Sequence, residues 1–171
     1  MLPSAYNNNF LIMQVPGYVV IYAEMIHDTR IIPLSGGNHL PTSVRLWHGD
    51  ARGRWDGNSL VVETTNLRRT EANAAAVGGD QILLRAANGR TDDTITVTER
   101  FTRIGANTLD YEFTIEDPAT WTQPWTAQVE LTKTDEPLYE YACHEGNYSM
   151  EGILAGARVQ EKASSEPREP R

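Results

Sequence analysis

A glutamate in an apolar row is the first feature of this sequence that could do chemistry. If Thr94–Arg103 is a β-strand, its side chains alternate between two faces, and Glu99 shares a face with Ile95, Val97 and Phe101. An unpaired carboxylate on such a face costs on the order of several kcal/mol. Glu99 therefore needs a partner, a raised pKa or a water-filled cavity. It is either half of a structural ion pair or part of a site.

A second acid, Glu63, lies in the apolar run Leu60–Thr65, on a face that could also point inward. Two carboxylates in one cavity raise the pKa of one of them and supply a general acid or base. In that case Glu99 or Glu63 is the expected catalytic base. A buried partner such as Arg30 or Arg100 would cancel this chemistry and leave a structural pair.

The segment Tyr139–Tyr148 gathers further reactive side chains where a strand is expected to meet a helix. It supplies His144 and Tyr141 as candidate catalytic acids. A nucleophilic pair of Cys143 and His144 is disfavoured, because neighbouring residues on a strand point to opposite faces.

Metal binding is an alternative without a recognisable ligand spacing. An N/O ligand set could combine three histidines with an acid, but no motif such as His-Glu-x-x-His occurs. The candidates for this metal-dependent alternative are His27, His48 and His144, with Glu24 or Glu145. The sequence therefore assigns no metal ligand and no cofactor.

Candidate ligand-binding residues cluster in two further segments. In Glu24–Arg30, the acids form an ion pair with Arg30, or Glu24 and His27 contact a ligand. In Leu46–Gly57, Arg54 could clamp a carboxylate, or it could stack on a tryptophan at the rim of the fold. The aromatic residues that could line a pocket are Tyr18, Trp47, Trp55, Tyr111, Phe113, Trp121 and Trp125.

Composition excludes several classes of function. The chain has 171 residues and a net charge of −8, which argues against nucleic acid and anionic membrane surfaces as partners. No apolar run approaches the roughly 20 residues that span a bilayer. Met1–Ser4 lacks the basic start and apolar stretch of a signal peptide. The single Cys143 leaves the redox compartment open.

The elements that must position these residues are mostly strands. Period-two patterns joined by turn signals predict an all-β fold, an antiparallel, lipocalin-like β-barrel of about eight to ten strands with a C-terminal helix. We expect residues 1–163 to form a single β-barrel domain and the polar tail 164–171 to be disordered. Residues 68–92 are mixed, with a helical turn or loop at Ala72–Val77. The main expected strands are 9–15, 18–26, 29–34, 44–48, 60–65, 94–104, 108–116, 126–133 and 138–143, with a helix over 146–163.

Several strings together resemble a large family of exported bacterial proteins without an established function, abundant in acidobacterial and proteobacterial environmental genomes. The resemblance covers nearly the whole chain. It implies a periplasmic or secreted protein, here lacking an upstream segment with Gly-Val-Trp and Cys motifs, and it implies no catalytic residue. The strings are Tyr6–Phe10, Glu24–Leu34, Gly53–Gly57, Leu60–Thr64, Glu99–Arg103, Pro124–Thr126 and Tyr139–Asn147.

These observations lead to one expected function and two alternatives. The expected function is binding of a small aromatic or apolar molecule in a barrel pocket, with lyase-, isomerase- or hydrolase-type acid–base chemistry as its enzymatic extension. One alternative is a non-enzymatic exported structural or ligand-binding protein, and the other is the metal-dependent enzyme. The oligomeric state stays open.

Overall fold

The computed structural model describes residues 9–68, 94–142, 145–146 and 148–165. The chain divides into two compact units, Met1–Glu140 and Tyr141–Arg171. Each unit is described by itself. His144, Cys143 and the mixed segment around Ala72–Val77 lie outside the described residues.

The first unit begins with a three-stranded antiparallel sheet in the order β1-β2-β3. Strand β1 spans Phe10–Val15, β2 spans Tyr18–Ala23 and β3 spans Asp28–Pro33. Pro16 and Gly17 form the tight turn between β1 and β2. A short 3-10 turn, η1 (Met25–His27), ends β2 earlier than the alternation of the sequence predicts.

The second sheet has five antiparallel strands that follow one another in the order of the sequence. Each strand pairs with the next, so that every connection in this sheet joins neighbouring strands. The strands are β4 (Asp50–Asp56), β5 (Ser59–Thr65), β6 (Thr96–Arg103), β7 (Thr108–Glu116) and β8 (Trp125–Thr132).

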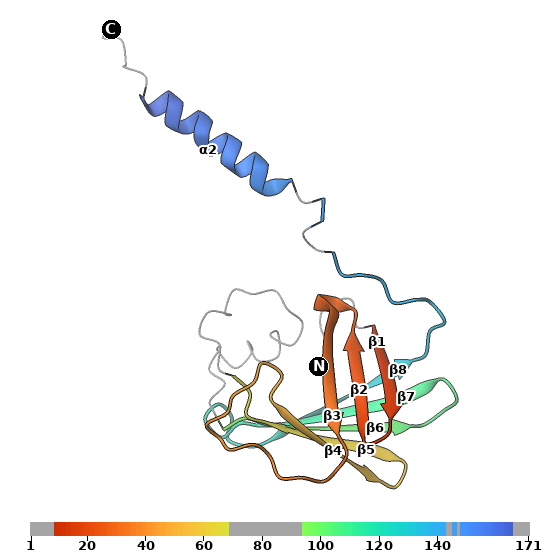
Figure 1. The fold of residues 1–171 in the computed structure, drawn as a ribbon. Helices are drawn as coiled ribbons and strands as arrows, with labels where there is room; N and C mark the ends of the chain where they lie inside the picture. Colours follow the sequence, from red (N-terminus) through yellow and green to blue (C-terminus); the bar gives the residue numbers. More distant parts are fainter. Residues whose placement is uncertain (1–8, 69–93, 143–144, 147, 166–171) are drawn as a thin grey trace. The chain divides into compact units, whose positions relative to one another are not determined.

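The three-stranded sheet crosses over the five-stranded sheet at a steep angle (Figure 1). Apolar side chains from both sheets fill the space between them, because each sheet turns one apolar face toward the other. This core cluster consists of Val19, Ile21, Ile32, Ala51, Leu60 and Val62. Gly53 lets the sheets approach closely, since a Cβ there would lie 2.8 Å from side-chain carbons of Ile32 and Leu34.

A second core cluster lies over β6 and β7. Phe101 stacks on Tyr111 with ring centroids 4.6 Å apart, and Trp125 meets both Phe113 and Trp121 edge-on. These ring contacts extend the core toward β8.

The all-β expectation is confirmed in its coarse form, while the described residues form no closed barrel. The described residues form two separate antiparallel sheets, because residues 34–49 connect β3 to β4 as a long loop and no ladder joins these strands. The expected strand over 44–48 is reduced to one bridge between Leu46 and Leu67. Residues 138–142 form no strand.

The second unit contains the expected C-terminal helix. Helix α2 spans Ser149–Ser165, against predicted bounds of 146–163. Its apolar residues Met150, Ile153 and Leu154 follow the spacing of one helical stripe. Within the described residues, no helix has the length and apolar character needed to cross a membrane.

Candidate functional site

Glu99 lies at the centre of the first unit, between the two sheets. The register of β6 sets Glu99 opposite Val62 of β5 and Phe113 of β7. Only 1% of its surface is exposed. The carboxylate therefore points from the five-stranded sheet toward the three-stranded sheet, whose β3 carries the buried Arg30.

Arg30 and Glu99 form a two-pronged ion pair that joins the sheets. Arg30 Nη1 donates to Glu99 Oε1 at 2.9 Å, and Nη2 donates to Oε2. Tyr111 Oη donates to Oε1 at 2.9 Å, and Arg30 Nη2 also donates to Thr64 Oγ1 at 2.6 Å. Both carboxylate oxygens and both terminal guanidinium nitrogens are thus occupied.

The surroundings of Glu99 keep it ionised. Burial raises its pKa, but the charge of Arg30 and the hydrogen bonds from Arg30 and Tyr111 outweigh burial and lower the pKa to about 2. A general base must take up a proton from a substrate that it faces, and it works best with a pKa near the working pH. Glu99 is buried and its pKa is about 2, so it suits neither requirement. Its position fits a structural ion pair.

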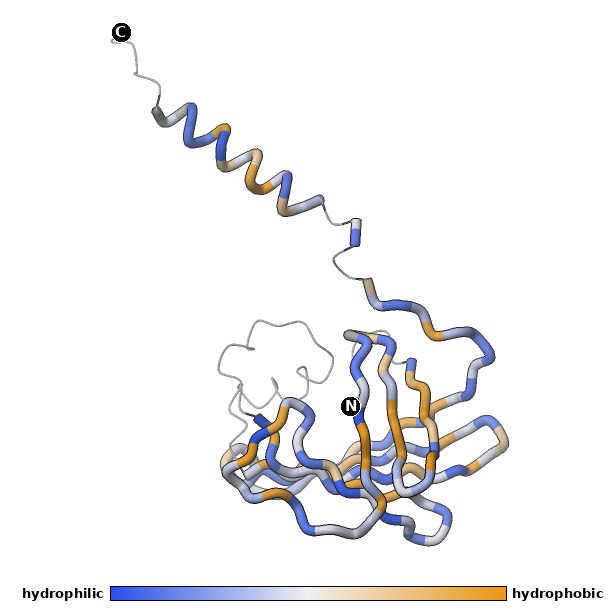
Figure 2. The backbone as a smooth tube through the Cα atoms, viewed as in Figure 1, coloured by the Kyte–Doolittle hydropathy of each residue, from blue (hydrophilic) through white to orange (hydrophobic). Residues whose placement is uncertain are grey.

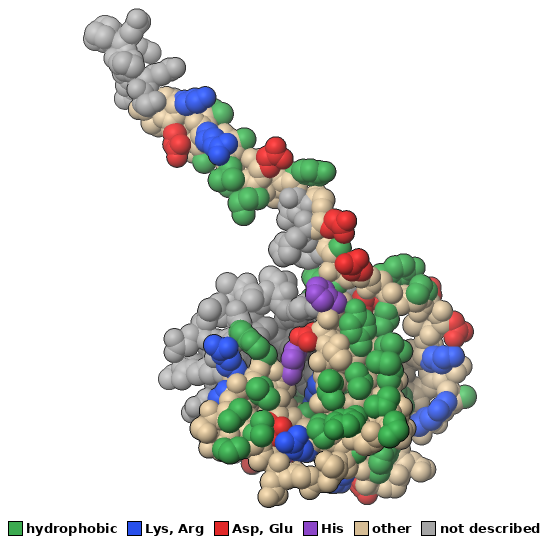
Figure 3. Space-filling view, in the orientation of Figure 1, with side chains coloured by type: hydrophobic (Ala, Val, Ile, Leu, Met, Phe, Trp, Pro, Cys, Tyr) green, Lys and Arg blue, Asp and Glu red, His purple; other side chains and the backbone are tan. Residues whose placement is uncertain are grey.

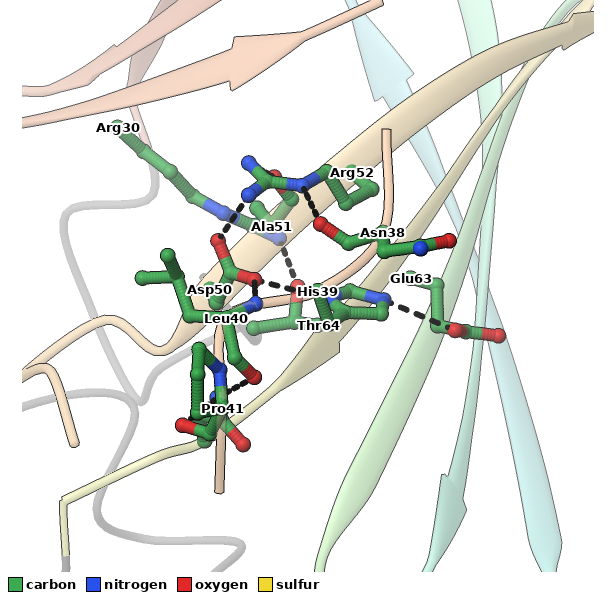
Figure 4. A network of polar contacts seen from close by, with 11 residues as sticks. Arg30, Asn38, His39, Leu40, Pro41, Asp50, Ala51, Arg52, Glu63 and Thr64 are labelled. Atoms are coloured by element: carbon green, nitrogen blue, oxygen red, sulfur yellow. Dashed lines mark hydrogen bonds and ion pairs between the residues drawn. The ribbon is translucent and has the colours of Figure 1, made fainter. Parts of the chain in front are cut away.

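A second polar cluster lies on the opposite face of the five-stranded sheet, at its β4 edge. The ring of His39, from the loop 34–49, lies between the carboxylates of Asp50 and Glu63 (Figure 4). Its Nδ1 is 3.0 Å from Asp50 Oδ2, and its Nε2 is 3.0 Å from Glu63 Oε1. This His39 cluster also includes Arg52, whose Nη2 lies 3.1 Å from Asp50 Oδ1.

Burial differs sharply across the His39 cluster. Asp50 is buried and also accepts a hydrogen bond from the Leu40 amide at 2.7 Å, so its position is fixed. Glu63 exposes 54% of its side chain and can turn into solvent. Each ring nitrogen of His39 has one carboxylate oxygen within hydrogen-bond distance. When Glu63 turns away, Asp50 still orients the ring and Nε2 becomes accessible, as in Asp–His pairs of acid–base enzymes.

The loop that carries His39 is fastened along its length. Asn66 Nδ2 donates to the carbonyl of Leu40 at 2.9 Å, and His48 contacts Asp28 at the start of β3. Gly49 has a φ of +69°, and a Cβ there would lie 2.5 Å from the Thr65 carbonyl oxygen. Because of these anchors, His39 is held against β4 and β5 although it lies outside regular structure.

Glu63 and Glu99 do not share a cavity. The register pairs Glu63 with Thr98, one position away from Glu99, so the two acids lie on opposite faces of the sheet. The sequence suggested a common inward face because β5 is buried on both sides from Ser59 to Val62. Alternation in such a strand cannot tell the two faces apart.

Glu24 and His27 have separate surroundings. Glu24 is buried and its Oε2 accepts hydrogen bonds from Tyr139 N at 3.1 Å and Asn9 Nδ2 at 3.4 Å. It therefore ties the chain that follows β8 to the end of β2. His27 is exposed and has a positive φ of 43°.

The remaining predicted residues are dispersed. Arg54 and Trp55 are exposed on β4. The guanidinium of Arg68 lies over one face of Trp47, 4.8 Å from the ring centroid, and Trp47 is otherwise exposed. Tyr111 and Trp125 belong to the core beside β6 and β7, while Tyr141 belongs to the second unit.

The metal alternative gains no support from the described histidines. His48 contacts Asp28, whereas His27 lies in η1. No group of three or more His, Cys, Asp or Glu side chains suited to a metal ion occurs in the described part of the chain. His144, the third histidine of that alternative, lies outside it.

An apolar surface covers the outer side of the three-stranded sheet, away from the core. Side chains on this side alternate with those that pack inward, and Ile31 is 61% exposed. Figure 3 shows hydrophobic side chains gathered over β1 to β3, and Figure 2 shows the same strands as hydrophobic. We call this surface the outer face. It consists of Leu11, Met13, Val15, Tyr18, Val20, Tyr22, Thr29, Ile31 and Pro33.

Sequence reasoning missed both the His39 cluster and the outer face. His39 lies 11 and 24 positions from its two acids, with no periodic pattern to connect them. The outer face had a signal, because β1 reads Phe-Leu-Ile-Met-Gln-Val and is apolar on both of its faces. Such a run is typical of a strand buried on both sides, whereas most of β1 is exposed.

Comparison of the chain with protein-family models, with curated proteins and with solved structures gave no match.

Proposed function

We propose that this protein is a non-enzymatic binding module that holds an apolar partner on the outer face of β1–β3. The observation that carries the proposal is the outer face itself. None of its nine positions carries a charged side chain, although the whole chain has a net charge of −8.

Exposed apolar area of this kind is unfavourable in water and is removed when a partner binds. Monomeric proteins rarely expose contiguous apolar patches larger than a few hundred Å², and larger ones mark interaction sites. Each Å² removed from water contributes about 25 cal/mol. Leu11, Val15, Tyr18 and Ile31 are each exposed by more than two fifths of their surface, so the outer face offers a partner several large side chains.

The state of Glu99 supports binding over catalysis. A solvated, unpaired acid on an apolar face favours chemistry, whereas an acid paired with arginine favours structure. Glu99 is buried and bound by Arg30 and Tyr111. The residue that the sequence offers first for acid–base work is thus committed to holding the sheets together.

Dye binding to matched variants tests this proposal. Nile red is a neutral apolar dye, so its binding is little affected by the negative charge of the protein. We expect saturable binding to the full chain that is lost in Ile31→Glu. The control is Ile104→Glu, because Ile104 is similarly exposed, at 56% against 61%, and lies outside the outer face. Equal dye binding by both variants, or no binding by the unaltered chain, would contradict the proposal.

The proposal also includes the cellular location of the protein, and an alternative form of it encloses the ligand in a pocket. The resemblance to exported bacterial proteins supports a periplasmic or secreted binding protein. Enclosure of a small aromatic or apolar ligand in a lipocalin-like barrel is the alternative form of the same binding function. It predicts that dye binding is lost when core positions are changed and is unaffected by Ile31→Glu.

A second candidate function, acid–base catalysis, rests on the geometry of His39. Buried Asp50 orients Nδ1 while Nε2 faces the exposed Glu63. Such a histidine can accept a proton from water or from a hydroxyl group. The test is hydrolysis of p-nitrophenyl acetate by the full chain and by His39→Gln. His48→Gln is the control, because His48 also contacts a carboxylate. Equal rates in all three proteins would exclude this function.

A further inference from the structure

We propose that β1 is a docking edge for β1 of a second copy of this chain, so that two three-stranded sheets join into one continuous sheet. The proposal goes beyond the binding function and does not depend on it. It concerns the backbone edge of β1, whereas the binding function concerns the side chains of the outer face.

The edges of the two sheets are protected unequally. Native proteins block edge strands with charged residues or proline, because an open edge is a template for another strand. In the described part of the chain, three of the four edge strands follow this rule. Strand β3 has Asp28, Arg30 and Pro33, β4 has Asp50, Arg52, Arg54 and Asp56, and β8 has Glu130. Strand β1 has neither a charge nor a proline over its six residues.

The backbone groups of β1 that point to the open side can be identified from one hydrogen bond. The Glu24 amide donates to the Asn9 carbonyl at 3.1 Å, so residue 9 directs its backbone groups toward β2. Pairing of backbone groups alternates along an antiparallel strand. Leu11 and Met13 therefore also pair with β2, while Phe10, Ile12 and Gln14 direct their N–H and C=O groups away from it. Among the described strands, β1 pairs with β2 alone.

These three residues define a two-fold register for self-pairing. An isologous contact places the same strand in antiparallel orientation across a two-fold axis. With Ile12 of one copy opposite Ile12 of the other, Phe10 faces Gln14 and each of these pairs exchanges two hydrogen bonds. On the outer face, Leu11 then lies opposite Met13, which matches apolar side chains across the junction.

Composition favours a second copy as the occupant, and the charge of the chain does not oppose it at this edge. The negative charges of the chain would repel an identical copy at most surfaces, but β1 itself contributes none. Interfaces between identical chains are the more apolar class, and Leu11, Ile12, Met13 and Val15 are all exposed apolar residues. One strand per copy is a small interface beside the roughly 800 Å² per partner of a standard complex. We therefore expect a dimer that dissociates on dilution.

Sedimentation of matched variants tests the dimer. The full chain should pass from one chain to two chains in mass as its concentration rises. Ile12→Lys should remain a single chain at every concentration, because two ammonium groups would meet at the axis. The control Val44→Lys adds the same charge at a similarly exposed residue, 39% against 36%, outside β1, and should dimerise normally. A full chain that stays monomeric at its highest soluble concentration, or an Ile12→Lys variant that still dimerises, would overturn the proposal.

Cross-linking tests the register without relying on Ile12→Lys. Opposite residues in a hydrogen-bonded pair have Cα atoms about 5.5 Å apart, within the range that a disulfide bridges. In a Cys143→Ser background, Ile12→Cys should form a covalent dimer on mild oxidation. Gln14→Cys should not, because Gln14 lies opposite Phe10 in this register. The reverse result, or equal cross-linking of both variants, would contradict the register.

Discussion

The contacts of Glu99 include the Arg30 guanidinium and the Tyr111 phenol, and loss of the two should have unequal effects. Glu99→Gln leaves Arg30 charged in the core, so we expect a loss of about 3–5 kcal/mol in the free energy of unfolding. Tyr111→Phe removes one hydrogen bond to the charged carboxylate and should cost about 1–3 kcal/mol. Urea denaturation followed by tryptophan fluorescence measures both.

A double variant separates charge from packing in the same experiment. Arg30→Met combined with Glu99→Leu removes both charges and should recover most of the stability lost in Glu99→Gln, because no unpaired charge stays buried. If the double variant is no more stable than Glu99→Gln, loss of the pair's shape, rather than an unpaired charge, explains the effect.

The lowered pKa of Glu99 predicts a specific acid sensitivity. Glu99 titrates at about 2 when folded and at 4.5 as a free side chain, so the folded state favours its ionised form. Its contribution is complete above pH 4.5 and is lost as the pH falls toward 2. At about 1.4 kcal/mol for each unit of pKa, the contribution is about 3 kcal/mol. Unfolding free energies measured between pH 7 and pH 2 should therefore fall less steeply in Glu99→Gln than in the unaltered chain.

At the residue scale, the sequence indicated that Glu99 needs a partner, but it did not indicate the residues of the His39 cluster. Alternation along β6 placed a carboxylate among apolar side chains, and Arg30 was one of two arginines that could pair with it. Alternation along β6 turns Arg100 to the face opposite Glu99, but the pairing with Arg30 depended on how β3 crosses β6, which no local pattern encodes. Arg100 instead pairs with Asp56 on the opposite face.

At the scale of the elements, Gly53 controls how closely the two sheets pack. In Gly53→Ala the added methyl would lie 2.8 Å from side-chain carbons of Ile32 and Leu34, so β3 or β4 must shift. We expect a loss of about 1–3 kcal/mol. Gly37→Ala is the control, because nothing lies within 4 Å of its added Cβ, and it should change stability by less than about 0.5 kcal/mol. Equal urea midpoints for the two variants would show that the sheets accommodate the methyl.

The strands that were predicted best are those with one polar and one apolar face. Strand β7, Thr108–Glu116, has the predicted bounds and alternates along its whole length. Strand β5 is buried on both faces over its first half, and the orientation of Glu63 could not be derived from it. The separation into two sheets was also beyond local patterns, because it depends on a loop, 34–49, that is fixed by His39, His48 and Asn66 through distant partners.

At the scale of the whole molecule, the first unit contains the interactions that define its own fold. Both core clusters, the Arg30–Glu99 pair and the His39 cluster lie within Met1–Glu140. A chain that ends after Glu140 should therefore unfold in urea with a free energy within about 0.5 kcal/mol of the full chain.

A shorter chain that ends at Glu136 is the comparison variant for the chain that ends at Glu140. It lacks the Tyr139 amide, which donates to the buried Glu24 carboxylate at 3.1 Å. Loss of that donor should cost about 1–3 kcal/mol, because the acceptor stays buried. The contact between Tyr139 and Glu24 would then be the last contact along the chain that stabilises the first unit. Tyr139 lies next to the boundary between the units in the sequence. If the chain ending at Glu140 is as destabilised as the shorter one, the second unit takes part in folding the first.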